Sequence, residues 1–206
     1  DQTAEAEQKG SGIAPFFNIN ITPTENLNIA IKYEMATKLE LENNTTSDLK
    51  TGFVNENPSQ PITKFPNGAK IRNDMPAMLA LGVQYKLPKL TLAAGANYYF
   101  DKDADYGHTY DATPRNSTDW SVAYTNEDII DQNGLSFQLG AEYGITDKIL
   151  VSGGYAWANK GVRESYQSDL TFANETNTIG FGGAYKINDK FKINLGAAYT
   201  MYQKDT

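Results

Sequence analysis

Apolar residues recur at every second position in paired segments along this chain. The clearest pair covers residues 75–85 and 90–100, which are joined by a short turn at 86–89. Because successive side chains of a strand point to opposite faces, each segment has one apolar face and one small or polar face. The pattern predicts β-hairpins. The same alternation recurs in residues 15–21, 27–35, 135–143, 149–157, 179–185 and 191–199.

Short turns within these hairpins alternate with long polar stretches between them. The long stretches cover residues 43–73, 101–133 and 159–176, and their composition predicts loops. Residues 1–11 are also predicted as loop, and the second strand is predicted to continue as far as Leu41. This alternation of short turns and long loops is typical of outer-membrane barrels.

The sequence therefore predicts an all-β fold, an antiparallel transmembrane β-barrel with about eight meander strands visible and the apolar face toward lipid. The alternative is a soluble sandwich, in which the apolar face points inward. Aromatic residues favour the barrel, because they gather at both ends of the apolar face, where lipid headgroups lie. They are Tyr85, Tyr143, Tyr185 and Phe191 at the turn end, and Tyr98, Phe100, Tyr155, Trp157 and Tyr199 at the loop end.

Composition excludes several classes of function. The 206 residues carry a formal net charge of −7, which argues against a nucleic-acid partner, since such proteins present basic patches. The absence of cysteine excludes disulfides, thiolate metal sites and cysteine nucleophiles. No apolar run reaches the ~18 residues that a membrane helix needs, whereas a spanning strand needs only about ten.

An even number of strands places both ends of the chain on the long-loop side. Bacterial barrels normally keep their ends on the short-turn side, so either the topology is inverted or a strand is missing at each end. We expect residues 1–206 to form a single β-barrel domain that is an internal piece of a larger barrel and lacks its terminal strand. Open sheet edges are not tolerated in lipid, so eight strands could close alone only if the first paired with the last.

Three hairpins carry recurring motifs. These motifs resemble the later strands of the FadL/TodX family of outer-membrane transport proteins, in the type common among Bacteroidetes. The resemblance implies a barrel of about fourteen strands, plugged by an N-terminal hatch that is not seen in this sequence. It also implies transport of long-chain fatty acids or other hydrophobic compounds across the bacterial outer membrane. The motifs are Gly82-Val-Gln-Tyr85-Lys-Leu-Pro-Lys89, Leu139-Gly-Ala-Glu-Tyr143-Gly-Ile-Thr-Asp-Lys148 and Gly182-Gly-Ala-Tyr185-Lys-Ile-Asn-Asp-Lys190.

Five large apolar or aromatic residues interrupt the small and polar face that would line the barrel lumen. A site for a hydrophobic ligand needs apolar contacts among a few polar groups, so these residues are the candidate ligand-binding set. The alternative is that they pack against a plug or against one another. They are Phe16, Met78, Tyr99, Leu150 and Tyr202.

Charged and amide side chains are predicted on the same inward face. They are expected to form ion pairs with one another, or else to meet the carboxylate of a ligand. They are Lys32, Glu34, Lys38, Glu40, Gln138, Glu142, Lys186 and Lys192.

The acidic run Asp101-Lys-Asp103-Ala-Asp105-Tyr-Gly107 resembles the start of a calcium loop. Its glycine is one position late and Ala112 replaces the bidentate glutamate, so a solvated acidic loop is favoured and no metal or other cofactor is expected. His108 is the sole histidine and has no catalytic motif around it, which predicts that the protein is not an enzyme.

These observations lead to one main hypothesis, a passive channel for hydrophobic small molecules such as fatty acids, in the bacterial outer membrane. Its partners would be the hydrophobic ligand (a fatty acid, lipid or detergent) and outer-membrane lipid, with no nucleic acid. The alternative is a barrel scaffold that binds partner proteins in secretion or surface attachment, a role that long polar loops also suit.

Overall fold

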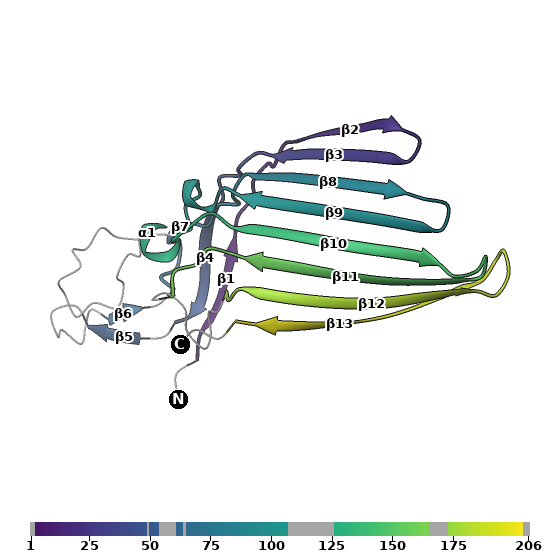
Figure 1. The fold of residues 1–206 in the computed structure, drawn as a ribbon. Helices are drawn as coiled ribbons and strands as arrows, with labels where there is room; N and C mark the ends of the chain where they lie inside the picture. Colours follow the sequence, from purple (N-terminus) through teal and green to yellow (C-terminus); the bar gives the residue numbers. More distant parts are fainter. Residues whose placement is uncertain are drawn as a thin grey trace. The chain divides into compact units, whose positions relative to one another are not determined.

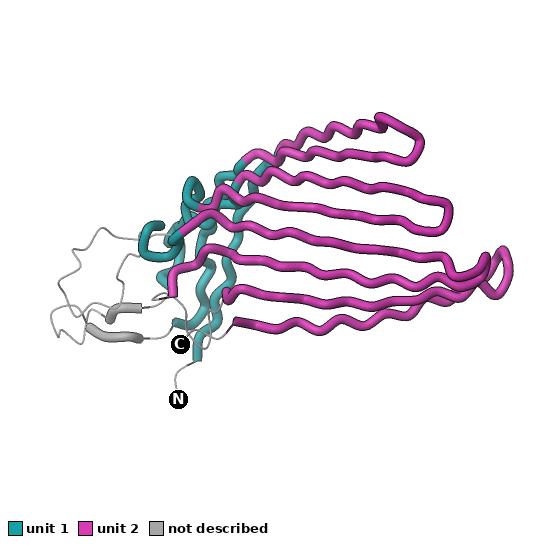
Figure 2. Tube along the Cα trace, viewed as in Figure 1, with its two compact units in different colours: residues 1–14, 36–76, 102–131 teal, residues 15–35, 77–101, 132–206 magenta. Residues whose placement is uncertain are grey.

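The computed structural model describes residues 3–48, 50–53, 61–63, 65–106, 126–164 and 173–203. The chain divides into two compact units, which Figure 2 shows in different colours. We call residues 15–35, 77–101 and 132–206 the meander unit, and residues 1–14, 36–76 and 102–131 the loop unit.

The meander unit is one sheet of eight antiparallel strands, each paired with its neighbour in chain order (Figure 1). This order confirms the eight strands that the alternating pattern predicts. The strands are β2 (Phe16–Thr24), β3 (Leu27–Glu34), β8 (Met78–Lys86), β9 (Leu90–Tyr99), β10 (Leu135–Gly144), β11 (Ile149–Asn159), β12 (Thr176–Lys186) and β13 (Lys192–Tyr202).

The register of the meander places the apolar positions of all eight strands on one face. A typical row runs from Ile31 to Leu81, then to Ala96 and Phe137 on the next two strands. Large side chains of this face are exposed, with Leu195 at 78%. A sandwich would cover such a face, so the soluble alternative is wrong. An exposed apolar face is what a sheet in lipid requires.

Short turns join the strands of each hairpin, and small polar side chains organise them. The Thr24 Oγ1 accepts a hydrogen bond from the Leu27 N–H at 3.1 Å in the β2–β3 turn. The Thr146 Oγ1 accepts the Ile149 N–H at 3.0 Å, and the Asn188 Oδ1 accepts the Phe191 N–H at 3.0 Å. These side chains bond to backbone groups where the ladder ends, which helps fix the register of these three hairpins. In the β8–β9 turn the Leu87 N–H instead donates to the Leu90 carbonyl at 2.7 Å.

The strand predicted to continue to Leu41 instead ends at Glu34. The Met35 N–H donates to the Pro15 carbonyl at 2.9 Å, and this is the last bond of that ladder. Because proline has no N–H, Pro15 has none to return, and the pairing stops there. In the loop unit, Thr37 then forms a single bridge with Met75.

The loop unit contains strands where the sequence predicts only loops. Its elements are β1 (Glu5–Lys9), β4 (Glu40–Ser47), β5 (Lys50–Phe53), β6 (Pro61–Thr63), β7 (Lys70–Arg72) and α1 (Asn126–Ile129), while η2 (Asp101–Asp103) lies where the chain passes from one unit to the other. A three-stranded sheet has the order β1-β4-β7, and β5 pairs with β6. Backbone pairing does not need an apolar face, so the polar segment β1 is a strand even though residues 1–11 show no alternation. Among the described residues, no helix is long and apolar enough to cross a membrane.

Candidate functional site

Three of the five predicted ligand-binding residues lie in one row across the meander. Phe16 on β2 is opposite Glu34 on β3, Glu34 is opposite Met78 on β8, and Met78 is opposite Tyr99 on β9. Directly opposite residues have Cβ atoms about 5 Å apart, so neighbouring side chains of the row are within contact range. The row lies on the polar face, at the strand ends remote from the short turns.

Lys32 completes this group from the next row of the same face. Its Nζ is 2.7 Å from the Glu34 Oε2 and 5.2 Å from the centroid of the Phe16 ring. The Lys32 side chain is 37% exposed and the Glu34 side chain is 23% exposed, so the pair is partly shielded from water. We call Phe16, Lys32, Glu34, Met78 and Tyr99 the loop-end cluster. It combines apolar surface with a single internally neutralised ion pair.

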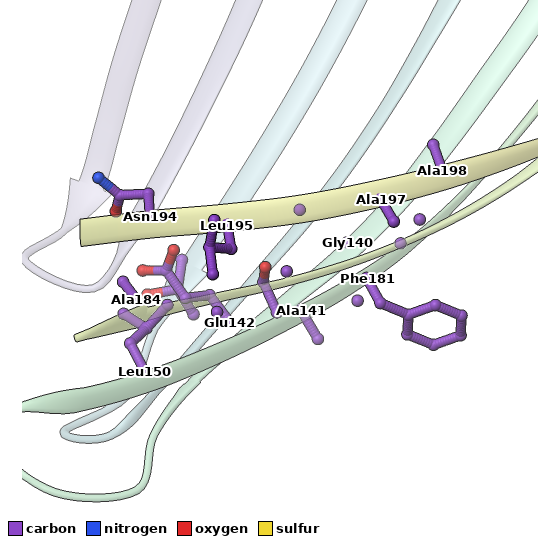
Figure 3. Close-up of a pocket in the computed structure, with 18 of the residues that line it drawn as sticks. Gly140, Ala141, Glu142, Leu150, Phe181, Ala184, Asn194, Leu195, Ala197 and Ala198 are labelled. Atoms are coloured by element: carbon purple, nitrogen blue, oxygen red, sulfur yellow. The ribbon is translucent and has the colours of Figure 1, made fainter.

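Leu150 lies at the other end of the polar face, near the short turns. It is opposite Gly144 on β10 and Ala184 on β12. It lines an open hollow of about 850 Å³ whose wall is mostly glycine and alanine. Figure 3 shows Leu150 and Ala184 at one end of this hollow, while the ring of Phe181 points away from it. Leu150 is therefore separate from the loop-end cluster.

Tyr202 stands apart from both groups. It lies on β13, opposite Thr176, and its side chain is 59% exposed. Four strand spacings separate β13 from β9, or roughly 19 Å along the sheet at about 4.8 Å per strand. The structure thus brings together Phe16, Met78 and Tyr99, and does not bring Leu150 or Tyr202 to them.

Glycines leave room for polar side chains to lie along the wall of the polar face. A Cβ added at Gly95 would lie 2.8 Å from the Gln138 side-chain oxygen on the paired strand. A Cβ at Gly182 would lie 2.7 Å from the Ser152 Oγ. Both distances are too short for a real Cβ. The sequence analysis missed these pairs, because a glycine opposite a polar residue becomes visible only once the register is known.

The predicted ion pairing of inward charges is confirmed for Lys32 and wrong for several other residues. Lys38 and Glu40 lie in the loop unit, and Glu40 pairs there with Lys70 at 2.9 Å. Lys186 pairs with Asp189 of the β12–β13 turn at 2.7 Å. The error for Lys38 and Glu40 follows from the early end of β3.

Asp74 is the main electrostatic feature of the loop unit. Its carboxylate accepts hydrogen bonds from Arg72, from the Leu39 N–H at 3.0 Å and from the Asp105 N–H at 3.3 Å. Burial raises the pKa of Asp74, but the bonds from Arg72, Leu39 and Asp105 outweigh it and hold that pKa below its ordinary value. This carboxylate connects three segments of the unit.

The acidic run at 101–107 does not gather into a cation cage in the part that the structure describes. The Asp101 carboxylate accepts the Gly134 N–H at 2.8 Å, whereas Asp105 bonds to Asp74 through its backbone. Within the described ranges, no group of three or more acidic or histidine side chains is placed to hold a metal ion. Gly107, His108 and Ala112 lie outside the described residues.

Comparison with solved structures shows the fold. The toluene transporter TodX of Pseudomonas putida matches with a TM-score of 0.56 and 16% identity, over 92% of this chain and 44% of that one. A FadL homologue of Pseudomonas aeruginosa matches with a TM-score of 0.62 and 14% identity, over 90% and 42%. A deltaS2 mutant of the TodX monoaromatic hydrocarbon channel matches with a TM-score of 0.59 and 17% identity, over 92% of this chain and 44% of that one. This chain therefore spans less than half the length of each of these three structures.

Sequence comparison shows the family. Among curated protein sequences, none matches this chain significantly. The sequence model of the outer membrane protein transport protein family (OMPP1/FadL/TodX), in contrast, matches residues 1–206. The predicted resemblance to the FadL/TodX family is confirmed, and with it the outer-membrane location and a barrel whose apolar face meets lipid. The Bacteroidetes type stays a prediction. The chain belongs to the OMPP1/FadL/TodX family of outer membrane proteins.

Proposed function

We propose that the protein to which this chain belongs is a passive channel for hydrophobic small molecules in the outer membrane, with long-chain fatty acids and neutral apolar compounds as the two candidate ligand classes. Family membership supports transport of apolar compounds, as does the similarity in fold to a toluene transporter. The observation that carries the proposal is the loop-end cluster. In this cluster Met78 and Tyr99 are on adjacent strands, and Phe16 lies in the same row with Glu34 between it and Met78, on a face that is otherwise small and polar. Passive movement along such a path needs no cofactor. That the protein is not an enzyme stays a prediction.

The hollow near the short turns extends the proposed path. Its glycine and alanine wall leaves an open volume of about 850 Å³, within the range of small-molecule pockets. Leu150 contributes a large apolar side chain there. We propose that ligands enter among the loops, contact the loop-end cluster and then move along the polar face past Leu150.

The test uses the full-length protein, expressed in the outer membrane of a Gram-negative host without its own family members. Uptake of radiolabelled toluene and oleate is measured in whole cells. We expect Phe16→Ser and Tyr99→Ser to lower uptake at least fivefold at equal surface expression. Thr178→Val, on the same face but on β12, is the matched control and should leave uptake unchanged. Uptake no higher than in empty cells would refute the proposal.

A second candidate function is a scaffold for partner proteins. It rests on the organised loop unit, in which a three-stranded sheet and the Asp74 carboxylate order polar segments that would otherwise be free coil. Normal uptake in a protein whose loop unit is disrupted by Asp74→Ala, together with loss of a surface-attached partner, would support this role. Loss of uptake in the same variant would favour a loop unit that serves the channel.

A further inference from the structure

The positive charge of the loop-end cluster, on Lys32, is already paired with a carboxylate. The Lys32 ammonium group is 2.7 Å from the Glu34 carboxylate on one side and 5.2 Å from the Phe16 ring centroid on the other. The polar face of β2, β3, β8 and β9 carries three charged residues, namely this pair and Lys86 at the turn end. On these four strands, a ligand at the cluster therefore meets no uncompensated cation.

Glu34 also stands at the centre of the apolar contacts. It is opposite both Phe16 and Met78, and Tyr99 follows in the same row. A ligand that touches these three side chains lies beside the Lys32–Glu34 pair, whose two charges offset each other at 2.7 Å. Water is partly excluded there, since the Glu34 side chain is 23% exposed. A carboxylate would lose part of its hydration without gaining an unpaired cation, so it is disfavoured, whereas an uncharged molecule has no such cost.

We propose that the loop-end cluster binds uncharged apolar molecules in preference to carboxylates of the same size, and that Glu34 determines this specificity by forming an ion pair with Lys32. The aromatic faces of Phe16 and Tyr99 and the thioether of Met78 supply contacts that need no charge. This inference rests on the proposed function, because it concerns the ligand of the same site. It separates neutral hydrocarbons and alcohols from fatty acids, which family membership alone does not do.

The experiment compares 1-decanol with decanoate at pH 8, on full-length protein in lipid nanodiscs. Both probes have the same chain length, and each competes with a fluorescent naphthylamine dye. For the unchanged protein we expect decanol to displace the dye at least tenfold more effectively than decanoate. Glu34→Gln frees Lys32. It should improve displacement of the dye by decanoate at least tenfold and change displacement by decanol less than twofold.

Two further variants make the result specific to this ion pair. In the double variant Lys32→Met with Glu34→Gln, the gain for decanoate should disappear because no cation remains. Glu25→Gln, in the β2–β3 turn, removes the same charge elsewhere and should leave the ratio of the two probes unchanged. If Glu34→Gln does not fold, Lys32→Met alone should weaken decanoate further and leave decanol within twofold.

The outcomes distinguish this inference from the proposed function. Equal binding of decanol and decanoate by the unchanged protein, or a ratio that Glu34→Gln does not move, would overturn the specificity and leave the channel intact. Failure of both probes to displace the dye in any variant would overturn the ligand site itself, and the specificity with it. A gain for decanoate in Glu25→Gln as large as in Glu34→Gln would assign the effect to overall charge and overturn the role of Lys32.

Discussion

The meander unit and the loop unit use the same strand geometry but are specified by different interactions. In the meander, every strand alternates between a lipid face and a polar face, so a slip of one residue would turn apolar side chains inward. The loop unit has few apolar residues to sort in this way. Single polar side chains, Asn43 and Asp74 among them, hold its segments together instead. The environment thus fixes the register of the first unit, and particular hydrogen bonds fix the second.

This difference has a consequence for tolerance to change. A lipid face accepts any apolar residue of suitable size, because lipid tails adapt to its shape. Side-chain identity therefore matters less in the meander than polarity does. A buried polar contact in the loop unit accepts no substitute that lacks the same donors and acceptors, since an unpaired buried group is costly. Substitutions in each unit can test both halves of this contrast, from the largest expected effect to the smallest.

Reversing polarity on the lipid face should give the largest loss of stability. Leu139 lies near the middle of β10, faces lipid and is 54% exposed. Leu139→Lys should lower the free energy of unfolding by about 2–4 kcal/mol, the cost of a lysine at the bilayer midplane. Urea unfolding in lipid vesicles, followed by tryptophan fluorescence, measures it. Gln138→Lys puts the same charge on the polar face one residue away and should cost less than about 1 kcal/mol. Equal losses would mean that β10 does not face lipid as described.

Removing the Asp74 carboxylate should give the next largest effect, confined to the loop unit. Hydrogen bonds to a charged group are worth about 1.5–3 kcal/mol, so Asp74→Asn should lower local stability by about 2 kcal/mol at neutral pH. Hydrogen–deuterium exchange of residues 36–48 and 65–76 measures the loss. Asp189→Asn is the control, because Asp189 is 95% exposed in its pair with Lys186.

The same carboxylate predicts a pH dependence. Its folded-state pKa is depressed, so its contribution is present above the unfolded value of about 3.9 and is lost as pH falls through the lower folded value. Exchange in the loop unit should therefore accelerate as pH falls below about 4, after correction for the intrinsic rate. The Asp74→Asn variant should show no such step. A step of equal size in that variant would assign the acid sensitivity to other carboxylates.

The sequence predicts the meander well because each strand carries its own evidence. Alternation and turn residues define β8 and β9 without reference to any other segment. Pairing across a long loop is different. Glu34 and Met78 are opposite each other although 43 residues separate them, and no turn fixes that register in advance. Phe16, Met78 and Tyr99 were therefore predicted as separate exceptions on the polar face, and their gathering around Glu34 was not.

The strands of the loop unit are not predicted from the sequence, for a related reason. Strand β1 has the sequence Glu-Ala-Glu-Gln-Lys, in which no alternation separates one face from another. It is a strand because β4 offers it a backbone edge and because Gln8 bonds to Asn43. Formation of this strand depends on a partner 35 residues away in the sequence, which local composition does not reveal. The same argument applies to Gly95, whose role appears only when Gln138 is placed opposite it.

The smallest expected effect is also the closest comparison within one strand. Asn43 and Asn44 are neighbours on β4, but Asn43 is 2% exposed and Asn44 is exposed. The Asn43 side chain accepts a bond from the Gln8 Nε2 at 2.9 Å and donates to the Pro66 carbonyl at 3.2 Å. Asn43→Ala removes both bonds, which should cost about 1–2 kcal/mol of loop-unit stability, measured as faster exchange at residues 5–9 and 65–69. Asn44→Ala should cost less than about 0.5 kcal/mol. Similar losses at both positions would show that β4 is held by its backbone pairing alone, and the contrast between the two units would then reduce to the presence or absence of lipid.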